Sequence, residues 1–169
     1  ALGAKVIAAA SDEAKLKVCR EKGAEVTINY KDQDLKAALK EACPQGVDVV
    51  LDPVGGSASE VCLRNTAWNG RYMVIGFASG EIPKLPFNLP LLKGCSIMGV
   101  FWGTMIGKEP KRFMGHLKDL VGLYSTGKIA PLVSATFPLY GAWEALNMLS
   151  QRKVLGKAVI LPSTPGSKL

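Results

Sequence analysis

The chain has 169 residues, of which 48% are hydrophobic and 21% are charged, and this composition excludes a chain that is disordered over most of its length. Lysine and arginine total 21 against 14 acidic residues, which gives a net charge of +7. Because these basic residues are spread along the chain, we do not expect nucleic acid as a partner. The longest uncharged stretch near the middle, residues 94–107, is shorter than the roughly 18 apolar residues of a membrane span, so we expect no membrane partner.

Short apolar runs alternate with amphipathic runs along the chain. In order, we predict a strand over 5–10, a helix over 12–22, a strand over 25–29, a helix over 35–42 and a strand over 47–52. The last of these runs is almost continuously apolar, which is typical of a strand covered on both faces. Ser57 and Glu60 form the pattern of a capping box and predict the next helix.

The second half continues the alternation. We predict strands over 71–76, 96–101, 132–137 and 158–161, helices over 113–124 and 139–149, and a loop at Pro83, Pro86 and Pro90. Tyr124 and Trp143 are predicted to be core residues. Strands and helices that alternate at this spacing indicate an α/β fold with a doubly wound, mainly parallel sheet.

Cysteine and histidine give no pattern of a metal site. The four cysteines lack two-residue spacing, and the one histidine, His116, is predicted to be a surface residue, so we expect no metal ligands. Unpaired cysteines are typical of reducing compartments, which favours a cytoplasmic location, with the mitochondrial matrix as the alternative.

Doubly wound sheets bind ligands at the carboxyl ends of their strands, so the residues after each strand are candidates. Residues 10–12 read Ala-Ser-Asp, 52–56 read Asp-Pro-Val-Gly-Gly, and 76–80 read Gly-Phe-Ala-Ser-Gly. Each motif alone is more often a simple turn than a ligand site. Asp12 is interpreted as a helix N-cap or a ribose hydroxyl acceptor, and Asp52 as a turn acceptor or a catalytic acid.

Taken together, these segments resemble the quinone oxidoreductase branch of the medium-chain dehydrogenase/reductase superfamily. The resemblance is carried by residues 1–8, 26–30, 47–56 (VDVVLDPVGG), 70–80 (GRYMVIGFASG), 100–103, 134–139 and 156–159. It implies a zinc-independent enzyme that transfers hydride from NADPH to a quinone or an α,β-unsaturated carbonyl. No residue of the chain is a convincing proton donor, so the catalytic residues stay unknown.

The resemblance also implies which residues bind the cofactor. Positions that match the 2′-phosphate site are Ser11, Lys15 and Tyr30, and no acidic residue closes the strand before Ser11, which favours NADPH over NADH. The remaining cofactor positions are Val54, Gly55, Gly76, Phe77, Ala78, Phe101, Trp102, Gly103 and Arg152, with the loop at 101–103 expected at the nicotinamide end. Core packing of the aromatic residues and a solvated Arg152 are the alternatives.

Relatives carry an upstream GroES-like catalytic domain, a first Rossmann strand and a Gly-rich turn that this sequence does not show. We therefore expect a Rossmann-type domain truncated at its N-terminus over 1–130, a segment over 131–162 that returns to the catalytic domain in relatives, and a flexible tail over 163–169. The strands at 5–10 and 47–52 are then expected to have unpaired edges. A homodimer through the sheet edge at 97–101 is implied, and a non-catalytic, nucleotide- or RNA-binding module is the alternative function.

Overall fold

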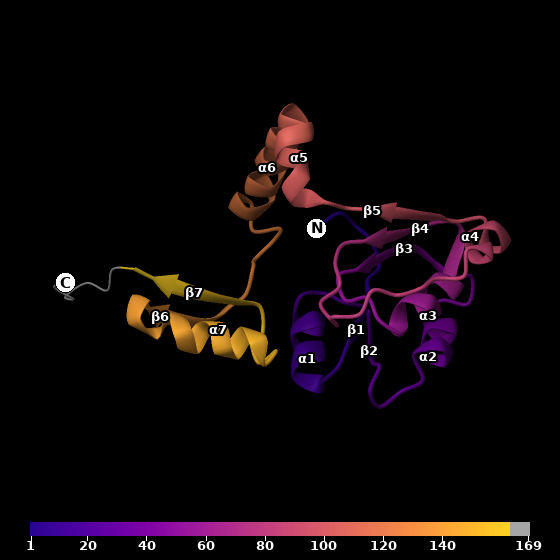
Figure 1. Cartoon of the computed structure of the whole chain (residues 1–169), viewed down its shortest axis with the longest axis horizontal. Coiled ribbons are helices and arrows are strands. Elements are labelled where there is room, and N and C mark those ends of the chain that lie inside the picture. The colour runs from indigo at the N-terminus through magenta and orange to yellow at the C-terminus, as the bar shows by residue number, and fades with distance from the viewer. Residues whose placement is uncertain (163–169) are drawn as a thin grey trace. The chain divides into compact units, whose positions relative to one another are not determined.

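A computed structural model describes residues 1–162 of the chain (Figure 1). The predicted tail over 163–169 lies outside these described residues. The chain divides into two compact units, one over residues 5–116 and one that joins residues 1–4 to the chain from Leu117 onward. The predicted domain boundary after residue 130 stays a prediction.

The first unit alternates strands and helices, and up to its fourth strand it does so as the sequence predicts. Its elements are β1 (Ile7–Ala10), α1 (Glu13–Glu21), β2 (Val26–Asn29), α2 (Leu35–Ala42), β3 (Val47–Asp52), α3 (Ala58–Arg64), β4 (Thr66–Val74), α4 (Asn88–Lys93), β5 (Ser96–Gly99) and α5 (Trp102–Lys108). Helix α6 (Pro110–Ser125) runs from the first unit into the second. Every strand pairing found in residues 1–162 is parallel, which confirms the predicted α/β class.

The strands of the first unit form two separate sheets, β1–β2 and β3–β4–β5. Within residues 1–162, β1 and β3 are each paired on one side only, which confirms the predicted unpaired edges. Val49 and Leu51 of β3 are 42% and 66% exposed. The expectation that β3 is covered on both faces was therefore wrong: Val49 and Leu51 point to the face opposite Val50, which packs on the core, and within the described residues their face is partly open to solvent.

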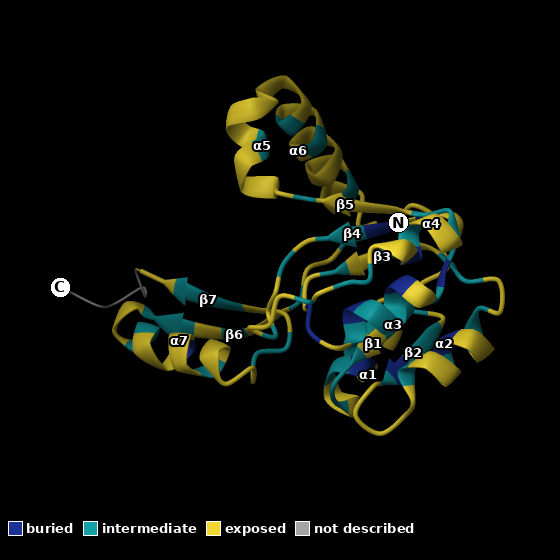
Figure 2. Cartoon of the chain, turned by 45° about the vertical axis from the view of Figure 1, so that its right-hand side comes forward, coloured by how far each residue is buried: buried dark blue, intermediate teal, exposed yellow. Residues whose placement is uncertain are grey.

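One core cluster of this unit lies between α3, α4 and β4, and further buried residues lie on α1, β2 and α2 (Figure 2). Leu63, Tyr72 and Leu89 are at most 4% exposed and pack with a partly buried shell: Val50, Cys62, Val74, Leu85 and Cys95. Burying one such leucine contributes about 1.5–3 kcal/mol. Burial raises the pKa of the Cys62 thiol to about 11, and the nearby negative charge of Asp52 adds to the effect.

Three local predictions were wrong. Ser57 makes no capping hydrogen bond to α3, and Glu60 pairs with Arg64 one turn later, so no capping box forms. The predicted proline loop contains α4, because Pro90 falls in its first turn, where a missing N–H leaves no acceptor unpaired. Strand β4 begins at Thr66 and not near Arg71, because an irregularity opposite β3 absorbs the extra residues.

The second unit contains β6 (Val133–Pro138), a 3₁₀ turn at Leu139–Gly141, α7 (Ala142–Ser150) and β7 (Lys157–Leu161). Strands β6 and β7 pair in parallel, and α7 buries Ala145 against them. Trp143 and Tyr124 are 78% and 63% exposed, so the prediction that they are core residues was wrong. Each lies on a helix that buries little else: α6 has no buried residue, and α7 has only one. None of the helices described between residues 1 and 162 has the length and apolarity needed to cross a bilayer.

Candidate functional site

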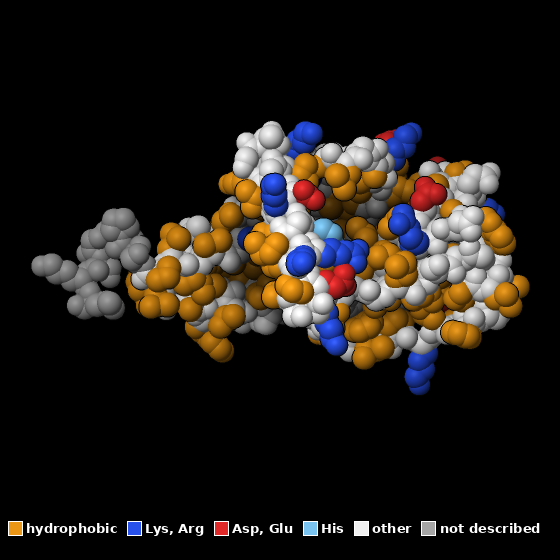
Figure 3. Space-filling view, turned by 90° about the horizontal axis from the view of Figure 1, so that it is seen from above, with side chains coloured by type: hydrophobic (Ala, Val, Ile, Leu, Met, Phe, Trp, Pro, Cys, Tyr) orange, Lys and Arg blue, Asp and Glu red, His pale blue; other side chains and the backbone are white. Residues whose placement is uncertain are grey.

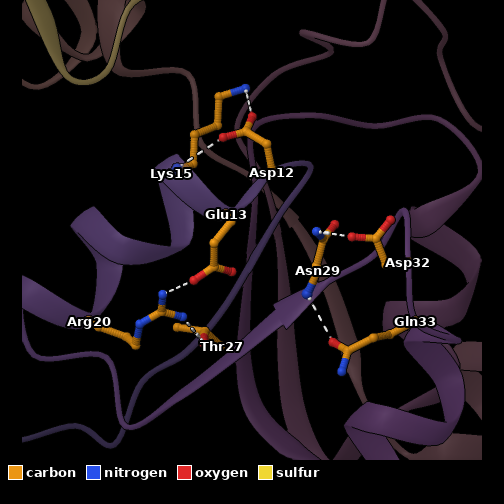
Figure 4. A network of polar contacts seen from close by, with 8 residues as sticks. All are labelled: Asp12, Glu13, Lys15, Arg20, Thr27, Asn29, Asp32 and Gln33. Carbon is orange, nitrogen blue, oxygen red and sulfur yellow. Dashed lines mark hydrogen bonds and ion pairs between the residues drawn. The ribbon is translucent and has the colours of Figure 1, made fainter.

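A polar cluster follows the carboxyl end of β1 (Figure 4). Asp12 caps α1: its Oδ1 accepts a hydrogen bond of 3.0 Å from the Lys15 amide, which confirms the N-cap interpretation. The Lys15 ammonium lies 2.9 Å from Asp12 Oδ2 and 3.2 Å from Ser11 Oγ. These hydrogen bonds and the positive charge of Lys15 lower the pKa of Asp12, so the carboxylate is ionised at neutral pH.

Tyr30 follows the neighbouring strand at the same end of this sheet. Its amide donates to Ala10 O over 3.2 Å, so the backbone of Tyr30 lies beside the residue that precedes Ser11. The turn after β2 is held by Asn29, which bonds to Asp32 and Gln33, and Arg20 of α1 bonds to Thr27 of β2 (Figure 4). The structure thus gathers the predicted 2′-phosphate residues around the carboxyl ends of β1 and β2.

The loops that follow β3 and β4 are hydrogen-bonded to each other. Ala78 N donates to Pro53 O over 3.0 Å, and Ser79 N donates to Val54 O over 2.9 Å. Gly55 has a φ of +71°, and a Cβ there would lie 2.9 Å from both Glu81 O and the Phe77 ring. Only glycine fits this close approach, which brings the predicted loops at 54–55 and 76–78 together.

Asp52, the last residue of β3, fixes the start of the first loop. Its Oδ1 accepts from the amides of Val54 and Gly55 at 2.8 and 2.9 Å, which confirms the turn-acceptor interpretation. Its Oδ2 accepts from Ser59 Oγ at 2.7 Å and from the Tyr72 hydroxyl.

These four hydrogen bonds use all four lone-pair positions of the Asp52 carboxylate and favour its ionised form. Burial raises the pKa of Asp52, but the bonds from Tyr72, Gly55, Ser59 and Val54 outweigh it and hold that pKa below its ordinary value. Burial and donation to Asp52 together raise the pKa of Tyr72. Asp52 is thereby a structural anion, and its four donors leave no geometry for a catalytic acid.

An apolar depression of about 300 Å³ lies where β4 and β5 end. It is lined by residues 74–77 of one strand end and 99–101 of the other, so it joins the predicted residues Gly76, Phe77 and Phe101. A surface without charged groups suits a flat aromatic ring.

Trp102 and Gly103 were expected to lie in a loop. In the structure they are instead the first two residues of α5. The Trp102 ring centroid lies 5.1 Å from that of Phe113 and 6.3 Å from that of His116, with the last pair stacked at 10°. His116 is therefore half-buried and not a plain surface residue. Sequence reasoning missed this aromatic cluster, as well as the roles of Tyr72 and Ser59, because all of these contacts join separate elements.

Arg152 belongs to the second unit, whereas the other predicted cofactor residues belong to the first. It follows α7 with a left-handed φ of 58°, and its amide donates to Leu149 O over 3.0 Å. Its predicted contact with cofactor stays a prediction. Across residues 1–162, no three His, Cys, Asp or Glu side chains gather in a way that could hold a metal ion.

Comparison with known proteins places this geometry in a family. A family model described as zinc-binding dehydrogenase matches residues 1–119. A quinone oxidoreductase-like protein 2 homolog from Nematostella vectensis is 40% identical over 160 residues, which is 94% of this chain and 44% of that protein. The chain thus spans about half the length of the curated relatives it matches.

Solved structures agree on the fold. An NAD-dependent alcohol dehydrogenase matches 95% of this chain and 45% of its own length, with a TM-score of 0.82 and 30% identity. A mycobacterial structure complexed with NADPH matches 95% of this chain and 50% of its own length, with a TM-score of 0.84 and 26% identity. The chain therefore belongs to the zinc-binding dehydrogenase family, with the Rossmann-type fold and the kinship to quinone oxidoreductases that its sequence motifs predict.

Proposed function

We propose that this chain is the cofactor-binding portion of an NADPH-dependent oxidoreductase that reduces a quinone or an α,β-unsaturated carbonyl. The observation that carries the proposal is that its polar and glycine-rich motifs lie at strand ends, the glycine-rich ones beside an apolar depression. Ligands of doubly wound sheets bind at such strand ends. Relatives named quinone oxidoreductase-like protein 2 support the reaction class.

The residues fit a phosphorylated dinucleotide. Ser11 and Lys15 would hold the 2′-phosphate, because their hydroxyl and ammonium groups lie 3.2 Å apart and both donate hydrogen bonds. Tyr30 would close the same site from the neighbouring strand. Since both an NAD-dependent and an NADPH-complexed protein are similar to this chain, the preference for NADPH depends on these side chains.

The two interlocked loops would hold the rest of the cofactor. Val54, which is 38% exposed, would contact the ligand, and the buried Gly55 would hold this loop against Phe77 and Glu81. The residues in and next to the depression would orient the nicotinamide: Gly76, Phe77, Ala78, Phe101, Trp102 and Gly103. The cofactor, when bound, supplies the hydride. The chain's own contribution is binding, orientation and an apolar wall that limits water.

The family's description names zinc, but the described residues gather no ligand set for it. We assign no step of the proposed reaction to a metal, and we propose the zinc-independent reaction type because the sequence motifs resemble those of quinone oxidoreductases. We also propose a homodimer through the edge at 97–101. Among residues 1–162, strand β5 is paired only with β4, and its Ile97 and Met98 are 39% and 44% exposed. Figure 3 shows hydrophobic side chains over much of the one face that it draws.

A reducing compartment, the cytosol or the mitochondrial matrix, is part of the same proposal. All four cysteines are free thiols and none is exposed. Free thiols of this kind are typical of proteins in reducing compartments.

Titration with NADPH and NADH, followed by nicotinamide fluorescence, tests the cofactor proposal. Lys15→Met should weaken NADPH at least about tenfold, since a hydrogen bond to a charged group contributes roughly 1.5–3 kcal/mol, and should leave NADH almost unchanged. Lys17→Met is the matched control, because Lys17 is an exposed lysine on the same helix. Absence of any response at millimolar NADPH would instead favour a non-catalytic module.

A further inference from the structure

The positive charge at the proposed 2′-phosphate site is already countered within the protein. Asp12 and Lys15 form an ion pair of 2.9 Å, and their side chains are 44% and 30% exposed, so a ligand that reaches Lys15 also meets Asp12 (Figure 4). The pair together carries no net charge. A phosphate of −1.5 to −2 charge therefore gains less there than it would from a free lysine.

The hydrogen-bonding capacity of the cluster points the same way. Two of the three ammonium hydrogens of Lys15 are directed to Asp12 Oδ2 and Ser11 Oγ, which leaves one for a ligand. Asp12 accepts from the Lys15 amide and ammonium and, over 3.3 Å, from Ser11, so one of its four lone-pair positions remains. An uncharged ribose hydroxyl can donate to that position, whereas a phosphate is repelled from it.

We infer that Asp12 is a specificity-determining residue that limits discrimination in favour of 2′-phosphorylated dinucleotides and lets the site accept unphosphorylated ones as well. This inference rests on the proposed function, because it assumes that the adenosine ribose binds beside Ser11 and Lys15. Asp12 has two separable tasks. Its Oδ1 caps α1, and its negative charge tunes the ligand site.

Replacing Asp12 by asparagine separates these tasks, since asparagine caps helices as well as aspartate does. Binding of adenosine 2′,5′-bisphosphate and of adenosine 5′-monophosphate to the full chain would be measured by calorimetry. These probes differ only in the 2′-phosphate. Asp12→Asn should tighten the bisphosphate at least about fivefold, the factor that one unit charge at roughly 4 Å contributes in water. The monophosphate should bind equally or more weakly.

Glu13→Gln is the control, because Glu13 lies in the same helical turn but pairs with Arg20 and not with Lys15. It should leave the ratio of the two affinities unchanged. Asp12→Ser, which also retains a cap, should reproduce the change seen with asparagine, and thermal melts should show both variants folded.

The outcomes separate the inference from the proposed function. Bisphosphate binding that is equal in the wild type and both Asp12 variants would overturn the inference and leave the cofactor site intact. If neither nucleotide bound to any folded variant, both the inference and the proposed function would be overturned. An increase with Glu13→Gln as large as with Asp12→Asn would also overturn the inference, because the effect would then be one of general charge.

Discussion

Removal of the Tyr72 hydroxyl tests whether the anchored carboxylate at the end of β3 stabilises the fold. The ring of Tyr72 is 1% exposed and packs with Leu63 and Leu89, so Tyr72→Phe keeps the core filled and removes only the donor to Asp52. A hydrogen bond to a charged group contributes about 1.5–3 kcal/mol. Asp52 keeps three donors at 2.7–2.9 Å, so we expect the lower end, a loss of about 1.5 kcal/mol in the free energy of unfolding.

Urea unfolding at pH 7, followed by circular dichroism, measures this loss. The midpoint should fall while the dependence on urea stays the same, because the surface exposed on unfolding does not change. Tyr124→Phe is the control: this tyrosine is 63% exposed, and its replacement should change stability by less than about 0.5 kcal/mol. Equal stability of Tyr72→Phe and the wild type would refute the claim that the Asp52 network anchors the loop.

Three further predictions follow from the same geometry. Because folding lowers the pKa of Asp52, its contribution to stability is present above its unfolded pKa of about 3.9 and is lost as the pH falls below that value. Between pH 7 and pH 3, the urea midpoint of Asp52→Asn should therefore fall less than the urea midpoint of the wild type. Gly55→Ala should cost at least about 1 kcal/mol more than Gly80→Ala by thermal melting, since both have positive φ but only Gly55 would drive a Cβ into neighbouring atoms; equal costs would contradict the close approach. Ile97→Lys should convert the proposed dimer to monomer in light scattering, because a charge on an open strand edge opposes pairing, and an unchanged mass would exclude this edge as the interface.

The sequence predicted those elements whose ends carry chemical signals. Strand β3 was predicted to the residue, because Gly46 and Pro53 bound its apolar run. Helix α2 was likewise predicted at its correct bounds from apolar residues on one face, ending before Pro44. The helix-cap role of Asp12 and the turn-acceptor role of Asp52 were each one of two interpretations offered from the sequence, and both could be offered because they depend only on residues close in sequence.

The misses share a physical cause. Helix α5 contains Gly103 and Gly107, and glycine has a low helix propensity, so the sequence did not predict a helix there. The helix forms nevertheless, and its first residue, Trp102, packs on Phe113 of the next helix. The bond between Tyr72 and Asp52 joins residues 20 positions apart, so it depends on the register of β3 against β4, in which Asp52 lies opposite Val74. Contacts of this kind are set by the register between strands, and no local pattern predicts them.

Asp12 and Asp52 both lie at strand ends, but their carboxylates have different roles. Asp52 accepts four hydrogen bonds from the protein, so its capacity is used up in fixing a loop and none remains for a ligand. Asp12 keeps one open position, stays 44% exposed and shares its charge with Lys15. Loss of Asp52 should therefore appear first in stability, whereas loss of the Asp12 charge with its cap preserved should appear in ligand choice. Both residues lie at the end of a strand, so their position does not distinguish them. The number of lone-pair positions that the protein already occupies distinguishes a structural carboxylate from one that can contact a ligand.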